Sequence, residues 1–288
     1  MIKKLATTDA HEGPVYVAAE RALYFSTQRA GRRVDIMRLS LDDGRISTVL
    51  ADASAANGMT LGPDGRLVVC EQQPAAISLV DPSTGARETV VDAFRGLPLN
   101  SPNDVVVKSD GSVWFTDPTF GILADYEGYK AEPEIDMNVY RIDGTTGKAT
   151  IVAEGVLGPN GLCFSPDEKI LYVIESRGVP TRKILAYDVA PGGDKLSNKR
   201  VLVDAGPGTP DGMRCDIDGN LWCGWGMGDP ELDGVVVFAP DGVMIGRIAL
   251  PERCANLCFG GLKRNRLFMA ASQSIYALYV NTQGVPGG

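Results

Sequence analysis

The sequence predicts an all-β fold, a six-bladed β-propeller of four-stranded antiparallel blades. An acid or an amide recurs at intervals of about 45 to 57 residues, each time followed by a short apolar stretch, and repeats of this length are typical of propeller blades. The 34 Gly and 18 Pro residues suit many short strands joined by turns. The recurring residues, called the landmark residues below, are Glu12, Asn57, Asn103, Asn160, Asp211 and Asn256.

The first two units contain short β-rich runs that are bounded by Asp-Gly turns. Gly at these turns supplies the positive φ that tight hairpins need, and the runs are rich in Val, Ile, Leu and Thr. We expect strands at 22–27, 36–41 and 46–50 in the first unit, and at 59–61, 67–70, 77–80 and 88–91 in the second.

The third unit carries an insertion at 117–134, which includes Tyr126 and Tyr129 and separates strands at 113–116 and 139–142. A loop of this length in a compact repeat is more often functional than incidental. Strands at 105–107, 162–164, 170–175, 213–215, 221–223, 235–238 and 275–280, and a strand pair that begins at Ile184, continue the pattern. We find no segment with convincing helical periodicity, so the insertion is expected to be a loop.

The last unit is one strand short, while residues before Glu12 are left over at the other end of the chain. We therefore expect residues 2–6 to supply the outer strand of the sixth blade and to close the ring. Closure of this kind limits exposed sheet edges. A closed ring also implies that residues 1–288 form a single domain.

Composition excludes several classes of function. The formal net charge is −8, with 36 acidic and 28 basic residues, and no basic stripe of the kind that nucleic-acid binding requires is present. There is no apolar run long enough for a membrane span and no secretory signal, so we expect a cytoplasmic protein. We also expect it to be a monomer or a weak homo-oligomer. The six Cys residues lack a zinc-site pattern and are expected to be reduced and structural.

Few residues are candidates for chemistry. His11 is the one histidine, no nucleophile-elbow motif accompanies it, and we expect it to be a loop residue beside Glu12. Equivalent positions of the blades face the axis, so oxygen-bearing side chains should converge there. Turn preference alone accounts for Asn57 and Asn256, which we leave out of the site. The carboxylates of Glu12 and Asp211 with the amides of Asn103 and Asn160 form an all-oxygen set, which favours a hard divalent cation such as Ca²⁺, Mg²⁺ or Mn²⁺.

A set of motifs resembles one known family, that of gluconolactonase, senescence-marker protein (regucalcin) and luciferin-regenerating enzyme. The resemblance extends from Glu12 to about Phe268. The motifs that carry it are Glu12-Gly-Pro-Val, Pro102-Asn-Asp, Phe115-Thr-Asp-Pro, Pro159-Asn-Gly-Leu with Phe164-Ser-Pro-Asp and Leu171-Tyr-Val, and Pro210-Asp-Gly-Met with Asp218-Gly-Asn-Leu-Trp.

The resemblance implies a six-bladed propeller that binds one divalent metal ion at its axis and hydrolyses a small-molecule lactone, usually a sugar lactone. The family's metal ligands fall on Glu12, Asn160 and Asp211, and the asparagine that contacts metal or substrate falls on Asn103. Ca²⁺ is the favoured ion, with Mg²⁺, Mn²⁺, Zn²⁺ and Fe²⁺ as alternatives. Members of the family often carry an arginine at the position of Ser101, so an aldonolactone substrate is less firmly implied than the fold.

The mechanism that we expect is metal-assisted opening of a cyclic ester, with Asp211 as the general base that activates water. Asn103, Ser101, Tyr126 and Tyr129 are the candidate substrate-binding residues. The aromatic residues of the insertion, and a Gly- and Trp-rich loop expected at 224–232 that contains Trp225, predict a partly apolar pocket over the metal. Two alternatives remain open: a phosphotriesterase-type hydrolase, and a calcium-binding propeller without catalytic activity.

Overall fold

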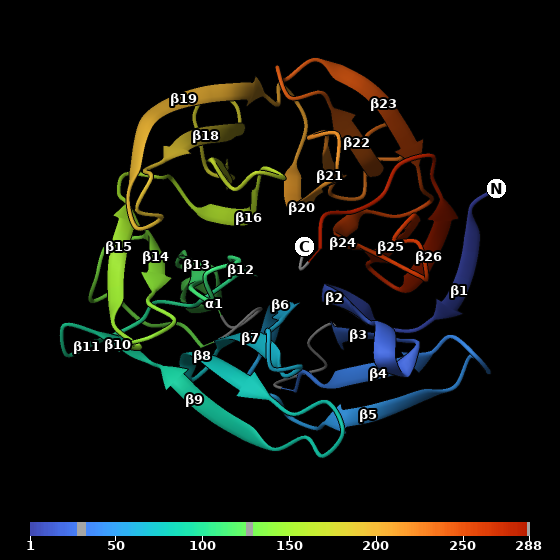
Figure 1. Cartoon of the computed structure of the whole chain (residues 1–288), viewed down its shortest axis with the longest axis horizontal. Helices are drawn as coiled ribbons and strands as arrows, with labels where there is room; N and C mark the ends of the chain where they lie inside the picture. The colour runs from blue at the N-terminus through green and yellow to red at the C-terminus, as the bar shows by residue number, and fades with distance from the viewer. Residues whose placement is uncertain (28–32, 125–128, 287–288) are drawn as a thin grey trace.

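The computed structural model describes residues 1–27, 33–124 and 129–286. These residues form six four-stranded antiparallel sheets arranged around a central axis, with one strand of each sheet next to the axis (Figure 1). The predicted six-bladed β-propeller is confirmed. The segment before each innermost strand lies at one end of the axis, and we call that end the landmark face.

The first three blades begin with β2, β6 and β12, which are their innermost strands. The first blade consists of β2 (Ala10–Val17), β3 (Ala22–Thr27), β4 (Ile36–Ser40) and β5 (Ile46–Leu50). The second consists of β6 (Ala56–Leu61), β7 (Leu67–Gln72), β8 (Ala75–Val80) and β9 (Arg87–Val91). The third consists of β12 (Val105–Val107), β13 (Val113–Asp117), β14 (Asn138–Ile142) and β15 (Ala149–Ala153).

The other three blades follow the same plan. The fourth consists of β16 (Pro159–Phe164), β17 (Ile170–Glu175), β18 (Lys183–Val189) and β19 (Leu196–Asp204). The fifth consists of β20 (Pro210–Cys215), β21 (Leu221–Trp225), β22 (Gly234–Phe238) and β23 (Met244–Ala249). The sixth contains β24 (Cys254–Gly260), β25 (Arg266–Ala271) and β26 (Ser274–Tyr279), with β1 (Lys3–Thr7) as its outer strand. A short ribbon of β10 (Ala93–Phe94) and β11 (Leu97–Pro98) leads into the third blade.

The ring closes as predicted, with an offset of one residue at each end of the closing strand. β1 pairs antiparallel with β26, from Lys3 opposite Ala277 to Thr7 opposite Ser274. Leu5 and Ala6 pack against the apolar cluster that joins the sixth and first blades. Strands from opposite ends of the sequence therefore share one sheet, and the N-terminus lies at the rim of the ring (Figure 1).

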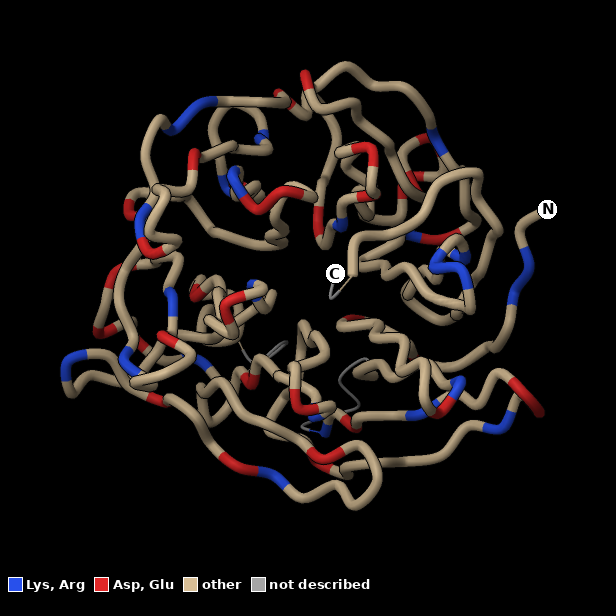
Figure 2. Tube along the Cα trace, viewed as in Figure 1, with Lys and Arg blue, Asp and Glu red and all other residues tan. Residues whose placement is uncertain are grey.

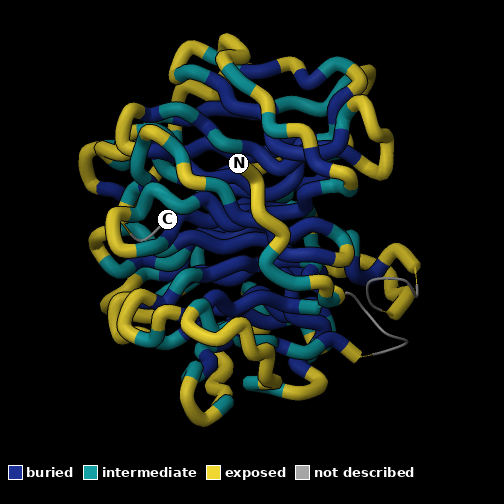
Figure 3. Tube along the Cα trace, turned by 90° about the vertical axis from the view of Figure 1, so that its right-hand side faces the viewer, coloured by how far each residue is buried: buried dark blue, intermediate teal, exposed yellow. Residues whose placement is uncertain are grey.

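Apolar side chains between neighbouring sheets form the core. One cluster, for example, combines Tyr172 and Ile174 of the fourth blade with Met213 and Cys223 of the fifth, and burial of such surfaces is the main stabilising contribution to folding. Buried residues fill the middle of the strands, while exposed residues gather in the loops at their ends (Figure 3). All six cysteines lie in this buried layer as free thiols, as expected.

Glycines let the innermost strands approach one another at the landmark face. A Cβ on Gly161 would meet the backbone of Asp211, and one on Gly212 would meet the side chain of Asn256. The register of the innermost strand also shifts at the landmark in five blades, for example between Pro159 and Leu162 of β16. Bulges of this kind re-aim side chains, here at the start of the axial channel.

Three features differ from expectation. The insertion begins with a short helix, α1 (Phe120–Leu123), where a loop was expected, and a 3₁₀ turn, η1 (Ala18–Glu20), follows β2. Trp225 ends β21 and is buried against Phe238 instead of lying in a loop. The helix α1 and the 3₁₀ turn η1 are too short for hydrophobic periodicity to reveal them. Among the described residues, no helix is long and apolar enough to cross a lipid bilayer.

Candidate active site

The landmark residues gather where the innermost strands begin. Glu12, Asn57, Asn160, Asp211 and Asn256 lie within the first residues of β2, β6, β16, β20 and β24, and Asn103 lies just before β12. Glu12 and Asp211 are only 6% and 5% exposed. Acidic and basic positions are spread over the whole ring (Figure 2), and buried carboxylates at the axis need a compensating charge or hydrogen bond.

Glu12 is held by its neighbours on the ring. Asn256 Nδ2 donates a hydrogen bond to Glu12 Oε2 at 2.8 Å, and the backbone N–H of Gly13 donates to the same oxygen at 3.2 Å. Burial raises the pKa of the Glu12 carboxyl well above its usual range, and the nearby charges of Asp211 and Asp104 raise it further. The Glu12 carboxylate is therefore a site at which a bound cation would be strongly favoured.

Asp211 is paired with an arginine from the next blade. Arg253, in the segment before β24, forms an ion pair with Asp211 Oδ2. The charges of Arg253 and Asp211 both act on the nearby His11 imidazole. Burial and Arg253 lower its pKa to about 4, against an opposing contribution from Asp211, so its imidazole is neutral near pH 7. The expectation that His11 is a loop residue is wrong, because it lies in β2 and is partly buried.

A second charged pair lies deeper in the channel. Arg214 and Asp104 are each 2% exposed, and Arg214 Nη1 lies 3.7 Å from Asp104 Oδ2. Arg214 also donates to the carbonyl of Met213 at 2.7 Å. Burial raises the pKa of the Asp104 carboxyl, while Arg214 opposes that shift. Three carboxylates thus share the axis with two guanidinium groups.

The donor set fits a hard cation. The side-chain oxygen of Asn57 is buried, and no hydrogen-bond donor in the described part of the chain reaches it. It joins the carboxylates of Glu12 and Asp211 and the amide of Asn160, so that the available ligands are oxygens. Residues 1–27, 33–124 and 129–286 contain no group of three or more His, Cys, Asp and Glu side chains in a metal-binding arrangement. An ion at the axis would consequently need amide as well as carboxylate ligands.

A cavity of about 260 Å³ opens above Asn160 and Asp211 on the landmark face. Its lining is more polar than the sequence predicted. Phe120 from the insertion and Met227 from the loop after β21 contribute apolar surface, but three arginines also line the cavity. The lining residues are Phe120, Asn160, Ser176, Arg177, Arg182, Thr209, Pro210, Asp211, Gly226, Met227 and Arg253.

The candidate substrate-binding residues occupy different environments. Ser101 is fully buried, and its hydroxyl donates to the carbonyl of Pro118 at 2.7 Å and accepts from the N–H of Gly121 at 3.0 Å. Ser101 therefore anchors the start of the insertion. Asn103 is 7% exposed at the axis, and its carbonyl accepts from the N–H of Gly58. Tyr129 is 38% exposed outside the cavity lining, and Tyr126 lies outside the described residues.

Sequence reasoning missed several residues of this site. Asn57 was assigned a turn role, yet its buried side-chain oxygen is available as a donor. Asn256 was assigned a turn role, yet it is fully buried and binds Glu12. Asn256 occupies a landmark position, and this was the signal for keeping it among the site residues.

Asp104 directly follows the landmark Asn103, whereas a glycine follows most of the other landmarks. This difference is visible in the sequence and could have identified Asp104. Arg253 lies outside the repeated motif, so the repeat gave no indication of its role.

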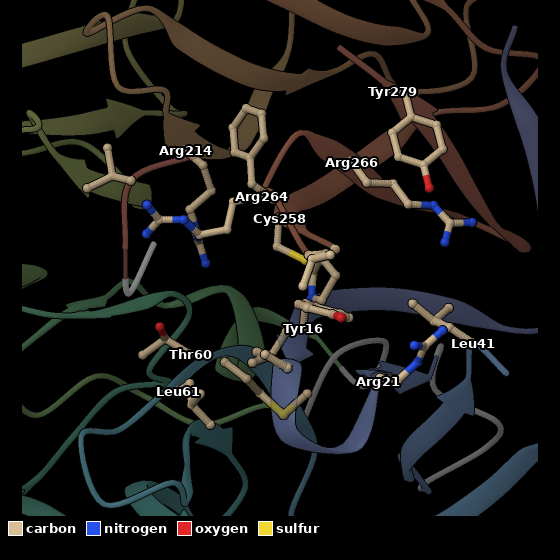
Figure 4. A pocket seen from close by; sticks show the side chains of 18 residues that line it. Tyr16, Arg21, Leu41, Thr60, Leu61, Arg214, Cys258, Arg264, Arg266 and Tyr279 are labelled. Carbon is tan, nitrogen blue, oxygen red and sulfur yellow. The ribbon is translucent and has the colours of Figure 1, made fainter. Parts of the chain in front are cut away.

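The opposite end of the axis has a cavity of its own, of about 730 Å³, lined by residues such as Tyr16, Arg214, Arg264 and Tyr279 (Figure 4). It shares no lining residue with the cavity at Asp211. Because its lining contains no acidic side chain from the described residues, it does not provide the carboxylate chemistry of the landmark face.

Comparison with known proteins gives a consistent picture. The family model described as "SMP-30/Gluconolactonase/LRE-like region" matches residues 10–273. The chain is 33% identical to a gluconolactonase of Zymomonas mobilis, over 95% of this chain and 79% of that protein. It is 27% identical to a pentonolactonase of Haloferax volcanii, over 96% and 82% of the two chains.

Among solved structures, a gluconolactonase from Xanthomonas campestris superposes with a TM-score of 0.86 at 34% identity, covering 96% of this chain and 89% of that one. A likeness that extends over nearly the whole ring includes every blade that contributes a landmark residue. The chain belongs to the SMP-30/gluconolactonase/LRE-like family.

Proposed function

We propose that this protein is a lactonase that hydrolyses a sugar lactone with the help of one divalent metal ion. The observation that supports the proposal is that Asn160 and Asp211 line a small open cavity, while the Glu12 carboxyl is close enough to Asp211 for the two charges to interact. The chain is also related over nearly its full length to proteins named gluconolactonase. The alternative of a binding protein without catalytic activity is less well supported, because the relatives with high coverage bear the names of lactonases.

Glu12, Asn160 and Asp211 would hold the ion, and the side-chain oxygen of Asn57 is a further donor at the same level. Ca²⁺ is the first choice for an all-oxygen set, and Mg²⁺, Mn²⁺, Zn²⁺ and Fe²⁺ are the alternatives. When bound, such an ion supplies Lewis-acid polarisation of the lactone carbonyl.

The protein's own residues would carry the proton transfer. Asp211 accepts a proton from the water that attacks the carbonyl carbon. The ring C–O bond of the lactone then breaks, and the ring oxygen takes up that proton from Asp211 and becomes a hydroxyl group of the open-chain acid. Asn256 keeps the Glu12 carboxylate in place through its hydrogen bond. The amide of Asn103 orients the substrate, while Ser101 acts indirectly by fixing α1, which brings Phe120 to the cavity wall. Substrate contacts from Tyr126 and Tyr129 stay a prediction, because Tyr129 is not among the residues that line the cavity and Tyr126 lies outside the described residues.

Replacement of Asp211 tests the assignment of the base. Asp211→Ala should lower kcat by roughly 10²- to 10⁴-fold, which is the usual contribution of a general base. The charge-matched control is Asp241→Ala, which removes an exposed carboxylate from a turn and should leave kcat unchanged. If Asp211→Ala retains full lactonase activity in a folded protein, Asp211 is not the base.

A further inference from the structure

The cavity above Asp211 has a basic rim that the proposed reaction does not use. Arg177 and Arg182 both line it, and both come from the connection between β17 and β18. Neither side chain is needed to balance Asp211, since Arg253 already forms that ion pair. Two further cations therefore stand beside a cavity large enough for one sugar-sized ring.

Packing holds Arg177 at this position although it is exposed to solvent. Its guanidinium lies over the ring of Phe120, 5.2 Å from the ring centroid. Gly158 lies next to both side chains, and a Cβ there would come within 2.9 Å of Arg177 Cγ and 3.2 Å of the Phe120 ring. The absence of a side chain at Gly158 thus makes room for the stacked pair. Such stacking restricts the arginine without using its hydrogen-bond donors.

The local acids do not neutralise these arginines. Within the described part of the chain, neither Arg177 nor Arg182 forms an ion pair. Glu175, at the end of the adjacent strand, accepts a hydrogen bond from the N–H of Leu157 at 3.1 Å and lies 3.8 Å from Lys183 Nζ. Among the described residues that line the cavity, Asp211 is the one acid.

Overall composition does not explain a basic rim, because the chain has a net charge of −8. Its long-range field repels anions, so an anionic ligand would need local cations at the binding site. Guanidinium groups bind phosphate and carboxylate through paired N–H donors. Two of them, placed at one side of a cavity whose floor is Asp211 and Asn160, would fix one end of a ligand while its other end lies at the axis.

We propose that the preferred substrate is an anionic lactone, with a phosphate or a carboxylate on the part of the molecule remote from the ester, and that Arg177 and Arg182 bind this group. The inference rests on the proposed lactonase function and assigns the substrate class of the same site. The two arginines are binding and specificity residues and take no part in bond breaking.

The test compares matched substrates. Wild-type enzyme, supplied with its activating ion, is assayed on glucono-δ-lactone, on its 6-phosphate and on glucaro-1,5-lactone, which share the six-membered ring and differ in the group at C6. We expect kcat/KM to be at least about tenfold higher for one of the anionic lactones than for the neutral one. A preference for the phosphate assigns a phosphate group and a preference for the carboxylate assigns a carboxylate. Equal kcat/KM for all three lactones overturns the proposal while the lactonase function stands.

Variants locate the effect. Arg177→Met and Arg182→Met should each lower kcat/KM for the preferred anionic lactone about tenfold more than for the neutral lactone, mainly through KM. Arg264→Met removes the same charge from the cavity at the other end of the axis (Figure 4), and should leave the ratio unchanged. Loss of the preference in Arg264→Met but not in Arg177→Met would overturn the assignment. Raising the ionic strength should reduce the preference, because exposed charges are screened.

A binding measurement separates this inference from the proposed function. Calorimetry with 6-phosphogluconate and with gluconate needs no turnover. Tighter binding of the phosphorylated acid, lost in Arg177→Met, supports the anion site even if no lactone is hydrolysed. Equal affinities in wild type and Arg177→Met contradict it even if the enzyme proves to be a lactonase.

Discussion

At the scale of single residues, the site is defined by carboxylates that have been placed close together. The charges of Asp211 and Asp104 raise the pKa of the Glu12 carboxyl, and the charge of Asp211 also raises the pKa of the Asp104 carboxyl. Arg253 and Arg214 supply the positive charge opposite these acids. A divalent ion at Glu12 and Asp211 would compete with Arg253 for the Asp211 carboxylate. The ion pair thus stabilises the ion-free site and opposes ion binding.

Replacing Arg253 tests this competition. Arg253→Met should raise the affinity for the divalent ion by about tenfold, because Asp211 no longer has to leave a guanidinium, and it should lower the melting temperature of the ion-free protein. Calorimetric titration with Ca²⁺ measures the first effect. Arg247→Met, at an exposed position of β23, serves as the control. Unchanged or weaker ion binding in Arg253→Met would exclude competition between the two cations.

Asp117 provides a separate test through pH. It accepts hydrogen bonds from the backbone N–H groups of Asn100 and Ser101 at 2.9 and 2.8 Å, but burial dominates and raises its pKa from 3.8 to about 7. A carboxyl with a higher pKa in the folded state keeps its proton there after the unfolded chain has lost it. Its contribution to stability therefore falls as the pH rises from about 4 to 7, by up to roughly 4 kcal/mol.

Urea unfolding of wild type and Asp117→Asn between pH 4.5 and 8 measures this contribution. The amide cannot ionise, so the difference in unfolding free energy, wild type minus variant, should decrease as the pH rises. The variant also loses hydrogen-bond acceptors and will be less stable at every pH, but that loss does not vary with pH. A difference that stays constant or grows with pH would show that Asp117 is already ionised at low pH.

At the scale of elements, the innermost strands position the chemistry. In five of the six blades the landmark residue lies at the end of the innermost strand where the register shifts, and Asn103 lies just before β12. The glycine that follows several landmarks lets the next blade come close. These glycines are consequently structural supports of the site. This explains why the landmark and its glycine recur together in the sequence.

Gly161→Ala should therefore destabilise the protein by about 2–4 kcal/mol, since a methyl group there would meet the backbone of Asp211 and Gly212. Gly246→Ala is the matched control, because the nearest atom to its Cβ, in Val237, is 3.8 Å away. Its effect should stay within about 1 kcal/mol. Chemical denaturation measures the free energy of unfolding of both variants. Equal destabilisation by Gly161→Ala and Gly246→Ala would show that the close approach at Gly161 does not matter for stability.

Prediction from sequence succeeded where the signal was periodic. The recurring landmark and its apolar strands predicted the ring, the six blades and the closing strand, because every blade repeats the same local pattern. It failed where a role depends on a distant partner. Asn256 looks like a turn residue until Glu12, 244 positions away, is placed beside it. Nothing near Arg253 or Arg177 in the sequence indicates that they flank Asp211, since loop positions have no period.

At the scale of the whole molecule, β1 completes the sixth blade and so closes the ring. Each innermost strand is then held between two neighbouring blades. We infer that residues 1–288 act as one domain, because the sixth blade needs strands from both ends of the sequence. A rigid ring allows side chains from six blades to meet at one point, which no single blade could achieve. The proposed activity is a property of this convergence.

The most direct test of the central claim is an ion-replacement assay. The protein is stripped with a chelator, and hydrolysis of glucono-δ-lactone is followed by proton release as Ca²⁺, Mg²⁺, Mn²⁺, Zn²⁺ or Fe²⁺ is added back, corrected for spontaneous hydrolysis. The account predicts that the stripped enzyme is inactive, that one of these ions restores activity, and that none restores it in Asp211→Ala. Full activity of the stripped enzyme, or no activity with any ion in a folded ring, would contradict the account.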